Sequence, residues 1–306
     1  MRKDSLIFIA NHKDLIGAAI LRRLKKRGYY NLLLENFDLT NQKRTKHFFK
    51  KRRPDYVFLP WIEAAGIMTN ISRPADLIYH NLSTQLNIIH SAYEYRTKKL
   101  LYLGSACSYP KSSLSPIKES SFLKGKIEKT NEAYAVAKIC GVKMCEAYAK
   151  QYKVNFISAI PTNTYGPGDD FSESGHVIPS LIRKFHQAKK NGLKKVEIWG
   201  TGKPKREFLY VDDIADACIF LMNNKYNSYK LINIAGGEEI SIKQLASLVK
   251  KITGFKGDVI YDKKKPDGTP RRLLDSSKIF DLGWHPKISL AKGISLTYHW
   301  YLKQYE

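Results

Sequence analysis

Short apolar runs alternate, in the first half of the chain, with longer segments whose apolar residues recur at helical spacing. The runs are rich in β-branched and aromatic residues and predict strands, whereas the longer segments predict amphipathic helices. The predicted strands cover residues 5–10, 31–36, 55–60, 99–106 and 155–161, and the predicted helices cover residues 17–28, 41–53, 74–95 and 133–152. Such alternation is typical of a mostly parallel sheet covered on both faces. We therefore predict an α/β fold with a doubly wound parallel sheet.

The pattern becomes less regular after Pro167. Longer loops separate shorter elements, namely a predicted helix over residues 177–190, a strand over 196–200, a helix over 241–253 and an ordered loop over 261–275. The chain contains no internal repeat and no low-complexity segment. We therefore predict a smaller α/β lobe that follows and partly interleaves with the main sheet.

The composition narrows the class of protein. A net charge of +24 favours anionic ligands, but the lysines are scattered and are not interleaved with aromatic residues, so we expect no specific nucleic-acid binding. No apolar run approaches the roughly 20 residues that a membrane span needs, so we expect no membrane partner. The four cysteines have neither zinc-site spacing nor the density of a disulfide framework, which favours a cytoplasmic protein.

The first predicted strand runs through a short loop, "NHKDLIG", into a helix. This is the outline of a Rossmann-type nucleotide-binding turn, in which three glycines let the backbone bend and approach a diphosphate. Asn11 and Asp14 occupy the first two glycine places, and Gly17 keeps the third. Asparagine tolerates a left-handed backbone, whereas Asp14 adds a carboxylate where an anion should meet the helix N-terminus. We predict a dinucleotide-binding Rossmann domain over residues 1–166 and a substrate lobe over residues 167–306.

Tyr134 and Lys138 are four residues apart in a predicted helix, so both side chains lie on one face. A nearby ammonium favours the phenolate and lowers the pKa of a phenol. Ser105 ends the strand before this helix and is placed to meet the phenol at the carboxyl edge of the sheet, where ligands bind in open α/β folds. A phenol, an ammonium and a hydroxyl at this edge indicate proton transfer to a bound substrate.

The chain resembles GDP-L-fucose synthases, which belong to the extended short-chain dehydrogenase/reductase superfamily. The resemblance runs from about residue 50 to the C-terminus and rests on motifs in order, among them "GSACSYP", "TNEAYAVAKICGVKMCEAY", "PTNTYGPGDDF", "HVIPSLIRKFHQA" and "WGTGKPKREFLYVDD". It implies epimerisation at C3 and C5 of GDP-4-keto-6-deoxymannose, or of a related GDP-linked 4-keto deoxysugar, and reduction at C4. It also implies a homodimer.

The resemblance implies roles for individual residues. Tyr134 would donate a proton during reduction, Lys138 would hold the nicotinamide ribose, and Ser105 would position the keto oxygen. Cys107 and His176 would be the acid and base of epimerisation. The cofactor would be NADP, with NAD possible, and its predicted contacts are Asn11, His12, Lys13, Ile16, Gly17, Glu35, Leu103, Gly104, Lys138, Pro161, Asn163 and His176. The predicted contacts of the GDP-sugar are Lys184, Trp199, Arg206, Asp267 and Arg272.

The cofactor half departs from the family pattern at three places: the loop 11–17, the segment after the second strand, and "FLPWIEAAGI" over residues 58–67. Glu35 stands near the place of an arginine that contacts the 2′-phosphate of NADP; it either favours NAD or points to solvent. Trp61 either fills cofactor space or folds into the core, and Glu63 lies beside it. The alternative to an active enzyme is a cofactor-impaired paralogue that acts as an epimerase only, or as a non-catalytic GDP-sugar-binding or regulatory subunit.

Overall fold

The computed structural model describes residues 1–35, 37–60, 67–172, 175–224, 226, 229–265, 267 and 269–306. The strands are β1 (Ile7–Ile9), β2 (Leu32–Leu34), β3 (Tyr56–Leu59), β4 (Lys99–Leu103), β5 (Phe156–Pro161), β6 (Asn163–Tyr165), β7 (Lys195–Trp199), β8 (Lys205–Tyr210), β9 (Ile232–Ile234), β10 (Glu239–Ser241), β11 (Asp258–Asp262) and β12 (Arg271–Arg272). The helices are α1 (Leu15–Lys26), α2 (Gln42–Arg52), α3 (Ile67–Ser72), α4 (Pro74–Glu94), α5 (Glu132–Tyr152), α6 (Val177–Lys190), α7 (Val211–Asn223), α8 (Ile242–Thr253), α9 (Ser277–Asp281) and α10 (Leu290–Tyr305), with short 3-10 helices η1 (Ala106–Ser108), η2 (Glu119–Ser121) and η3 (Lys129–Asn131).

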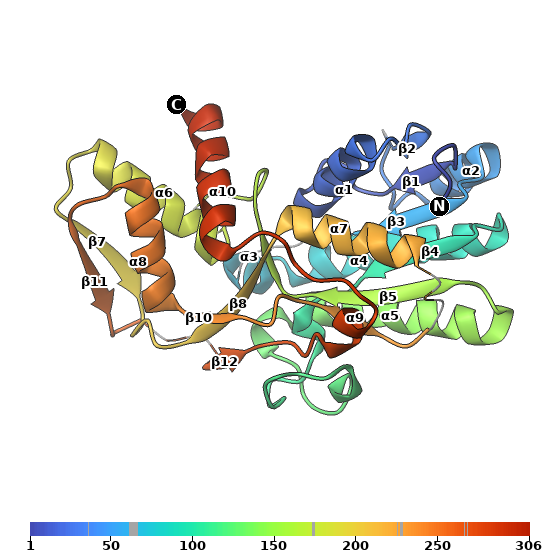
Figure 1. The fold of residues 1–306 in the computed structure, drawn as a ribbon. Helices are drawn as coiled ribbons and strands as arrows, with labels where there is room; N and C mark the ends of the chain where they lie inside the picture. The colour runs from blue at the N-terminus through green and yellow to red at the C-terminus, as the bar shows by residue number, and fades with distance from the viewer. Residues whose placement is uncertain are drawn as a thin grey trace.

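The main sheet has six parallel strands in the order β2-β1-β3-β4-β5-β9. Figure 1 shows the strands from β2 to β5 side by side. The doubly wound parallel sheet predicted from the sequence is therefore confirmed. The strand order reverses between β1 and β3, and ligands bind at the carboxyl ends beside such a reversal. The sixth strand, β9, comes from the later part of the chain. The boundary at residues 166 and 167 stays a prediction.

Alternate residues of each buried strand pack into opposite layers, as the pleat of a strand requires. Ile7 and Ile9 of β1 belong to an apolar cluster with α1 and α7, whereas Phe8 belongs to a second cluster with α2, α4 and α5. The rings of Phe8 and Phe49 of α2 meet edge to face with their centroids 5.6 Å apart. Both faces of the sheet are therefore covered, which explains why its strands read as continuous apolar runs.

The second lobe packs α6, α8 and α10 around its own apolar cluster. Its strands form the pair β11–β7 and a small sheet with β8 at its centre, flanked by β10 and β12, with β6 also paired to β8. Helix α8 begins with a capping box between Ser241 and Gln244 and ends at Gly254 in the left-handed conformation. Figure 1 shows this lobe next to the main sheet.

Several helices and strands in the second half of the chain are not predicted by the pattern of apolar and polar residues. Helix α7 is buried on nearly all sides, so it lacks the polar face that marks an amphipathic helix. The segment 261–275, predicted as a loop, contributes to β11 and contains β12. That part of the prediction is wrong, because a two-residue strand leaves no alternating pattern to read.

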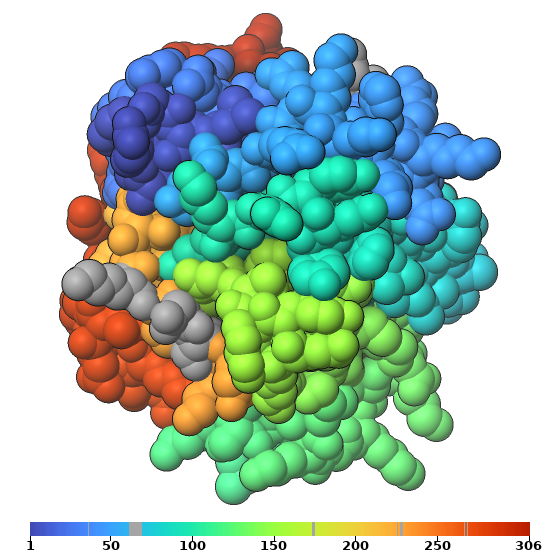
Figure 2. Space-filling model, turned by 90° about the vertical axis from the view of Figure 1, so that its right-hand side faces the viewer, coloured from blue at the N-terminus to red at the C-terminus, as the bar shows by residue number. Residues whose placement is uncertain are grey.

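The first half of the chain, coloured blue to green, covers most of the face in Figure 2, and the orange and red C-terminal segments lie along one side. Within the residues that the structure describes, no helix is both long enough and apolar enough to span a membrane.

Candidate active site

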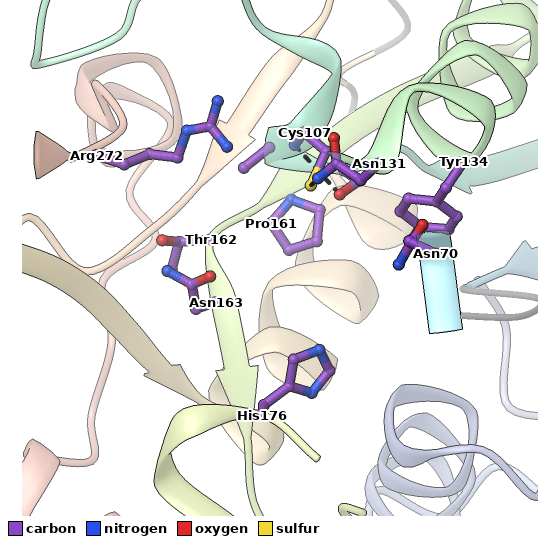
Figure 3. A pocket seen from close by; sticks show the side chains of 11 residues that line it. Asn70, Cys107, Asn131, Tyr134, Pro161, Thr162, Asn163, His176 and Arg272 are labelled. Atoms are coloured by element: carbon purple, nitrogen blue, oxygen red, sulfur yellow. Dashed lines mark hydrogen bonds between the residues drawn. The ribbon is translucent and has the colours of Figure 1, made fainter. Parts of the chain in front are cut away.

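A pocket lies at the carboxyl ends of β4 and β5 and collects residues from both halves of the chain. It is lined by Asn70, Ser105, Ala106, Cys107, Asn131, Tyr134, Pro161, Thr162, Asn163, His176 and Arg272. Figure 3 shows Cys107, Asn131 and Tyr134 at one end of the pocket and His176 at the other. Four of the five residues predicted to be catalytic therefore share one cavity, and the fifth, Lys138, follows Tyr134 by one turn of α5.

Ser105 and Tyr134 form the polar centre of the pocket. Ser105 is two residues beyond the end of β4, and its hydroxyl accepts a hydrogen bond from the backbone N–H of Cys107 at 3.3 Å. Tyr134 is 5% exposed. Burial raises the pKa of Tyr134 well above its usual range, the nearby sulfur of Cys107 raises it further, and a hydrogen bond with Ser105 acts in the opposite direction. The net direction is opposite to the lowering that the sequence predicts for this phenol, because desolvation of the phenolate outweighs the other influences.

Lys138 is fully buried on α5, and its ammonium lies 4.6 Å from the centre of the Tyr102 ring. Burial lowers the pKa of Lys138 to about 7, although the carboxylate of Asp14 acts to raise it. In the described part of the chain, Nζ of Lys138 has no hydrogen-bond partner. A buried amine without a partner is costly, so this nitrogen is suited to a hydroxyl group supplied by a ligand.

Cys107 sits on η1, and its sulfur accepts a hydrogen bond from Nδ2 of Asn131 at 3.0 Å. Asn131 immediately precedes α5, where an asparagine is ordinarily a helix cap. Asn131 is therefore not recognisable from its sequence position as a pocket residue, although it stands within the "TNEAYAVAK" motif.

His176 immediately precedes α6 and is 46% exposed at its side chain. Its Nδ1 lies 3.6 Å from Oδ1 of Asp169, whose side chain is almost fully buried. This carboxylate raises the pKa of His176, and burial acts against it. Asp169 is a second residue that the sequence analysis does not single out, because nothing in the sequence tells which carboxylate of "GPGDDF" faces the histidine.

The loop 11–17 shows how the chain accommodates its missing glycines. Asn11 has a φ of 50°, the left-handed conformation that asparagine was expected to tolerate. Asp14 has an ordinary extended backbone, with φ −76° and ψ 164°, so no glycine is needed there for conformational reasons. A Cβ atom on Gly17 would collide with the backbone oxygen of Asn11, so the third glycine is required by the turn itself.

The side chain of Asp14 changes the electrostatics of this loop. It stands at the N-terminus of α1 without a side-chain capping bond among the described residues. Burial raises the pKa of Asp14 to about 6; the carboxylate of Asp169 also raises it, while Lys138 and His176 act to lower it. Asp14 therefore belongs to the electrostatic environment of the pocket.

Glu35 follows β2 and contacts His12, with Oε2 3.2 Å from Nδ1 of the imidazole. The Glu35 side chain is 10% exposed, so it does not simply point to solvent. Lys13, in the loop between β1 and α1, is exposed. Trp61 and Glu63 lie outside the described residues.

The other predicted cofactor contacts fall around the same edge. Ile16 is buried in the first turn of α1, Leu103 is the last residue of β4, and Gly104 follows it. Pro161 and Asn163 line the pocket, and Nδ2 of Asn163 donates to the backbone oxygen of Glu207 at 2.8 Å.

The predicted GDP-sugar contacts divide into two groups. Arg272 lines the pocket, whereas Lys184, Trp199, Arg206 and Asp267 do not. Arg206 is held by its guanidinium, which donates to the backbone oxygen of Lys205 at 2.7 Å. Asp267 accepts from both the N–H and the hydroxyl of Thr201, at 2.8 and 2.6 Å. Trp199 is 61% exposed, and the ammonium of Lys265 lies 5.2 Å from its ring.

The residues present fit the nicotinamide ribose of a dinucleotide cofactor but disfavour its diphosphate. The unpartnered Nζ of Lys138 suits a ribose hydroxyl, and the tight turn at Gly17 brings the loop backbone to the N-terminus of α1. Asp14 disfavours a diphosphate there whenever it is ionised. Within the described residues, no group of histidine, cysteine and acidic side chains could hold a metal ion.

A doubly wound sheet with a serine, a tyrosine and a lysine gathered at its carboxyl edge defines the short-chain dehydrogenase/reductase class. The model of the "NAD dependent epimerase/dehydratase family" matches residues 7–235. The chain belongs to this family.

Relatives narrow the similarity to one group of enzymes. The chain is 51% identical to "Putative GDP-L-fucose synthase 2" of Arabidopsis thaliana, covering 99% of this chain and 93% of the relative. It is 44% identical to the GDP-L-fucose synthase of Escherichia coli K12, over 97% of this chain and 96% of that protein. A GDP-mannoheptose C4 reductase from Campylobacter jejuni, solved with NADP bound, superimposes with a TM-score of 0.90 at 40% identity and covers 99% of both chains.

Proposed function

We propose that this protein is a nucleotide-sugar epimerase/reductase that converts GDP-4-keto-6-deoxymannose, or a related GDP-linked 4-keto sugar, to GDP-L-fucose or its analogue. The observation that carries the proposal is one pocket that holds Cys107 and His176 together with Ser105 and Tyr134. A reductase alone needs the serine and the tyrosine, whereas the cysteine and the histidine supply a second proton-transfer pair. Neither this pocket nor the relatives support the alternative of a non-catalytic subunit.

Epimerisation follows from the acidity of hydrogens next to a ketone. The 4-keto group acidifies C3–H and C5–H, so a base can remove a proton and an acid can return one to the opposite face. Cys107 and His176 come from different elements and stand at opposite ends of the pocket. Asp169 raises the pKa of His176, which favours the protonated imidazole and suits this residue to donate a proton. We assign proton exchange at C3 and C5 to this pair.

Reduction uses the other side chains of the pocket. The nicotinamide cofactor, when bound, supplies a hydride to C4. Tyr134 then protonates the C4 oxygen, and its raised pKa keeps the phenol protonated until it is needed. Ser105 orients the keto oxygen through its hydroxyl. Lys138 would hold the nicotinamide ribose, with Leu103, Gly104, Pro161 and Asn163 around it.

We propose NADP as the cofactor, as in the C. jejuni relative, and keep NAD as a second candidate. Glu35 favours NAD, because a carboxylate after the second strand accepts from a free ribose 2′-hydroxyl and repels a 2′-phosphate. Calorimetric titration with NADPH and NADH decides between them. If Glu35 sets the choice, Glu35→Gln raises the affinity for NADPH relative to NADH; an unchanged ratio removes Glu35 from the argument.

The GDP moiety is assigned to the second lobe. Arg272 and Arg206 offer guanidinium groups suited to a diphosphate, and the exposed ring of Trp199 offers a flat surface for a base. Lys184 supplies a further positive charge. Asp267 is already bonded to Thr201, so its role is to hold the loop beside Trp199 in place.

A homodimer and a cytoplasmic location belong to the same proposal. Helices α4 and α5 pack against each other and leave Tyr79, Leu86 and Tyr152 exposed. These side chains would be covered if the two helices paired with their copies in a second molecule. Sedimentation equilibrium tests this: a monomer at micromolar concentration would contradict it.

The function is tested by turnover. Purified protein is incubated with GDP-4-keto-6-deoxymannose and NADPH, and the sugar product is identified by chromatography and mass spectrometry. We expect GDP-L-fucose with the wild type and none with Tyr134→Phe. Proton exchange without reduction would leave an epimerase, and neither reaction with either cofactor would overturn the proposal.

A further inference from the structure

The side chain of Asn131 is placed for a task other than helix capping. The residue occupies the N-cap position of α5, yet its side chain makes no capping hydrogen bond among the described residues. Asparagine is a preferred cap because its oxygen accepts from the first free N–H groups of a helix. Here that interaction is given up, and the amide turns into the pocket instead.

Both ends of the amide are significant. Nδ2 donates to the sulfur of Cys107 at 3.0 Å, the contact drawn in Figure 3. Oδ1 is buried and has no hydrogen-bond partner within the described residues. A buried acceptor without a partner costs free energy, so an oxygen in this state at the wall of a binding pocket is suited to a hydroxyl group of the ligand.

We propose that Asn131 is a positioning residue for epimerisation, orienting the Cys107 sulfur through the hydrogen bond from Nδ2 and a substrate sugar hydroxyl through Oδ1. This inference rests on the proposed function and deepens it. An N–H group stabilises a thiolate more than a thiol, because hydrogen bonds to charged acceptors are the stronger ones. When a hydroxyl engages Oδ1, the amide is polarised and its N–H becomes a better donor to the sulfur.

Each epimerisation step removes one proton from the sugar and returns one. The thiolate of Cys107 removes a proton from carbon beside the ketone, the C–H electron pair passes into the enolate, and His176 protonates the opposite face. The reverse assignment, with the thiol as donor, uses the same contact, because Asn131 then stabilises the thiolate that is left. The other titratable or charged residues that line this pocket are Tyr134 from α5, His176 before α6 and Arg272 from β12. Behind this lining, Asp14 before α1 and Asp169 beside His176 also act on its charges.

Two variants separate this role from a structural one. Asn131→Ala removes both ends of the amide. Asn131→Asp keeps the shape and the acceptor but, when ionised, loses the donor and adds a negative charge beside the sulfur. Asn155→Ala is the matched control, because Asn155 also has a buried oxygen without a partner in the described residues but precedes β5, at the other end of the strand from the pocket.

The first readout is the reactivity of the thiol. Alkylation by iodoacetamide is followed across pH by peptide mass spectrometry, with exposed Cys140 as the internal reference. We expect both Asn131 variants to move the midpoint of the Cys107 profile upward by about one pH unit, the shift that corresponds to a tenfold change, with Asn131→Asp moving it at least as far. The Cys140 profile and the Asn155→Ala protein should match the wild type.

The second readout is proton exchange with solvent. Deuterium incorporation at C3 and C5 of GDP-4-keto-6-deoxymannose is measured in D2O without a reductant, and we expect a loss of about tenfold or more in both variants. If the wild type exchanges no deuterium, the proposed function fails. If it exchanges and both variants match it in exchange and in the Cys107 profile, the role of Asn131 is wrong while the function stands. An equal shift of Cys107 and Cys140 would also overturn the role.

Discussion

Asp14 is the residue whose replacement tests the altered loop most sharply. We expect Asp14→Asn to stabilise the protein without ligand at neutral pH and to leave its stability near that of the wild type at pH 4. Burial raises the pKa of Asp14 from 3.8 to about 6. A carboxyl whose pKa is higher in the folded state disfavours folding once it ionises, so the penalty is absent below about pH 4, grows between pH 4 and 6, and is complete above pH 6.

The size of the effect follows from that shift. Each pKa unit is worth about 1.4 kcal/mol, so a shift of roughly two units sets an upper limit of about 3 kcal/mol on the gain. Partial exposure of Asp14 reduces it, and we expect a gain of about 1–3 kcal/mol at pH 7.5 from urea unfolding. Asp14→Gly should gain less than Asp14→Asn, because the backbone at residue 14 is ordinary and glycine adds about 0.5–1 kcal/mol of unfolded-state entropy.

The same charge should oppose the cofactor. Removing a carboxylate from the N-terminus of α1 favours binding of an anion there. We expect Asp14→Asn to bind NADPH about tenfold more tightly at pH 7.5, a difference of about 1.4 kcal/mol, and the wild type to approach the variant at pH 5.5. Calorimetry at both pH values measures this. A stability gain of equal size at pH 4 and pH 7.5, or none at either, would refute the electrostatic reasoning.

Three further changes have defined outcomes. Lys138→Met should raise the free energy of unfolding by about 3–4 kcal/mol at pH 7 and about 2 kcal/mol at pH 9. The reason is that the penalty of a buried ammonium with a pKa of about 7 is complete below that pH and fades toward pH 10.5. Urea unfolding measures the gain, and a gain that does not shrink with rising pH would be inconsistent with this origin. Cys107→Ser should slow deuterium exchange at C3 and C5 by about 100-fold while NADPH affinity in calorimetry is unchanged; wild-type exchange would remove Cys107 from the mechanism. Gly17→Ala should cost about 1–3 kcal/mol of stability, because its Cβ meets the backbone of Asn11; an unchanged unfolding midpoint would show that the turn can relax.

Some parts of the fold and of the pocket could be predicted from the sequence, and others could not. Strands such as β4 and β5 are continuous apolar runs because they are buried on both faces, and helices such as α2 and α4 keep a polar face, so their patterns are legible. Helix α7 has little polar face, and the short strands β6, β10 and β12 are set by pairing with or near β8. The secondary structure of these segments depends on tertiary contacts, which cannot be read from the local sequence pattern.

The site divides in the same way. Tyr134 and Lys138 share a helix face, so their spacing alone places them together. Cys107 and His176 line one pocket only because of the fold, and their sequence positions could be paired only by resemblance to a family. Asn131 and Asp169 were missed because their roles depend on side-chain direction: one gives up a helix cap for a sulfur, and the other turns its carboxylate to the histidine. The strength of the charge penalty at Asp14 likewise depends on burial, which the sequence does not reveal.

The most direct test of the account is turnover of GDP-4-keto-6-deoxymannose with NADPH in D2O, with the isotopic pattern of the product read by NMR. The account predicts GDP-L-fucose with solvent deuterium at C3 and C5, the cofactor's hydride at C4, and one cofactor oxidised per sugar. Recovery of the substrate without deuterium and with all of its cofactor still reduced, from folded protein and with NADH as well, would contradict it.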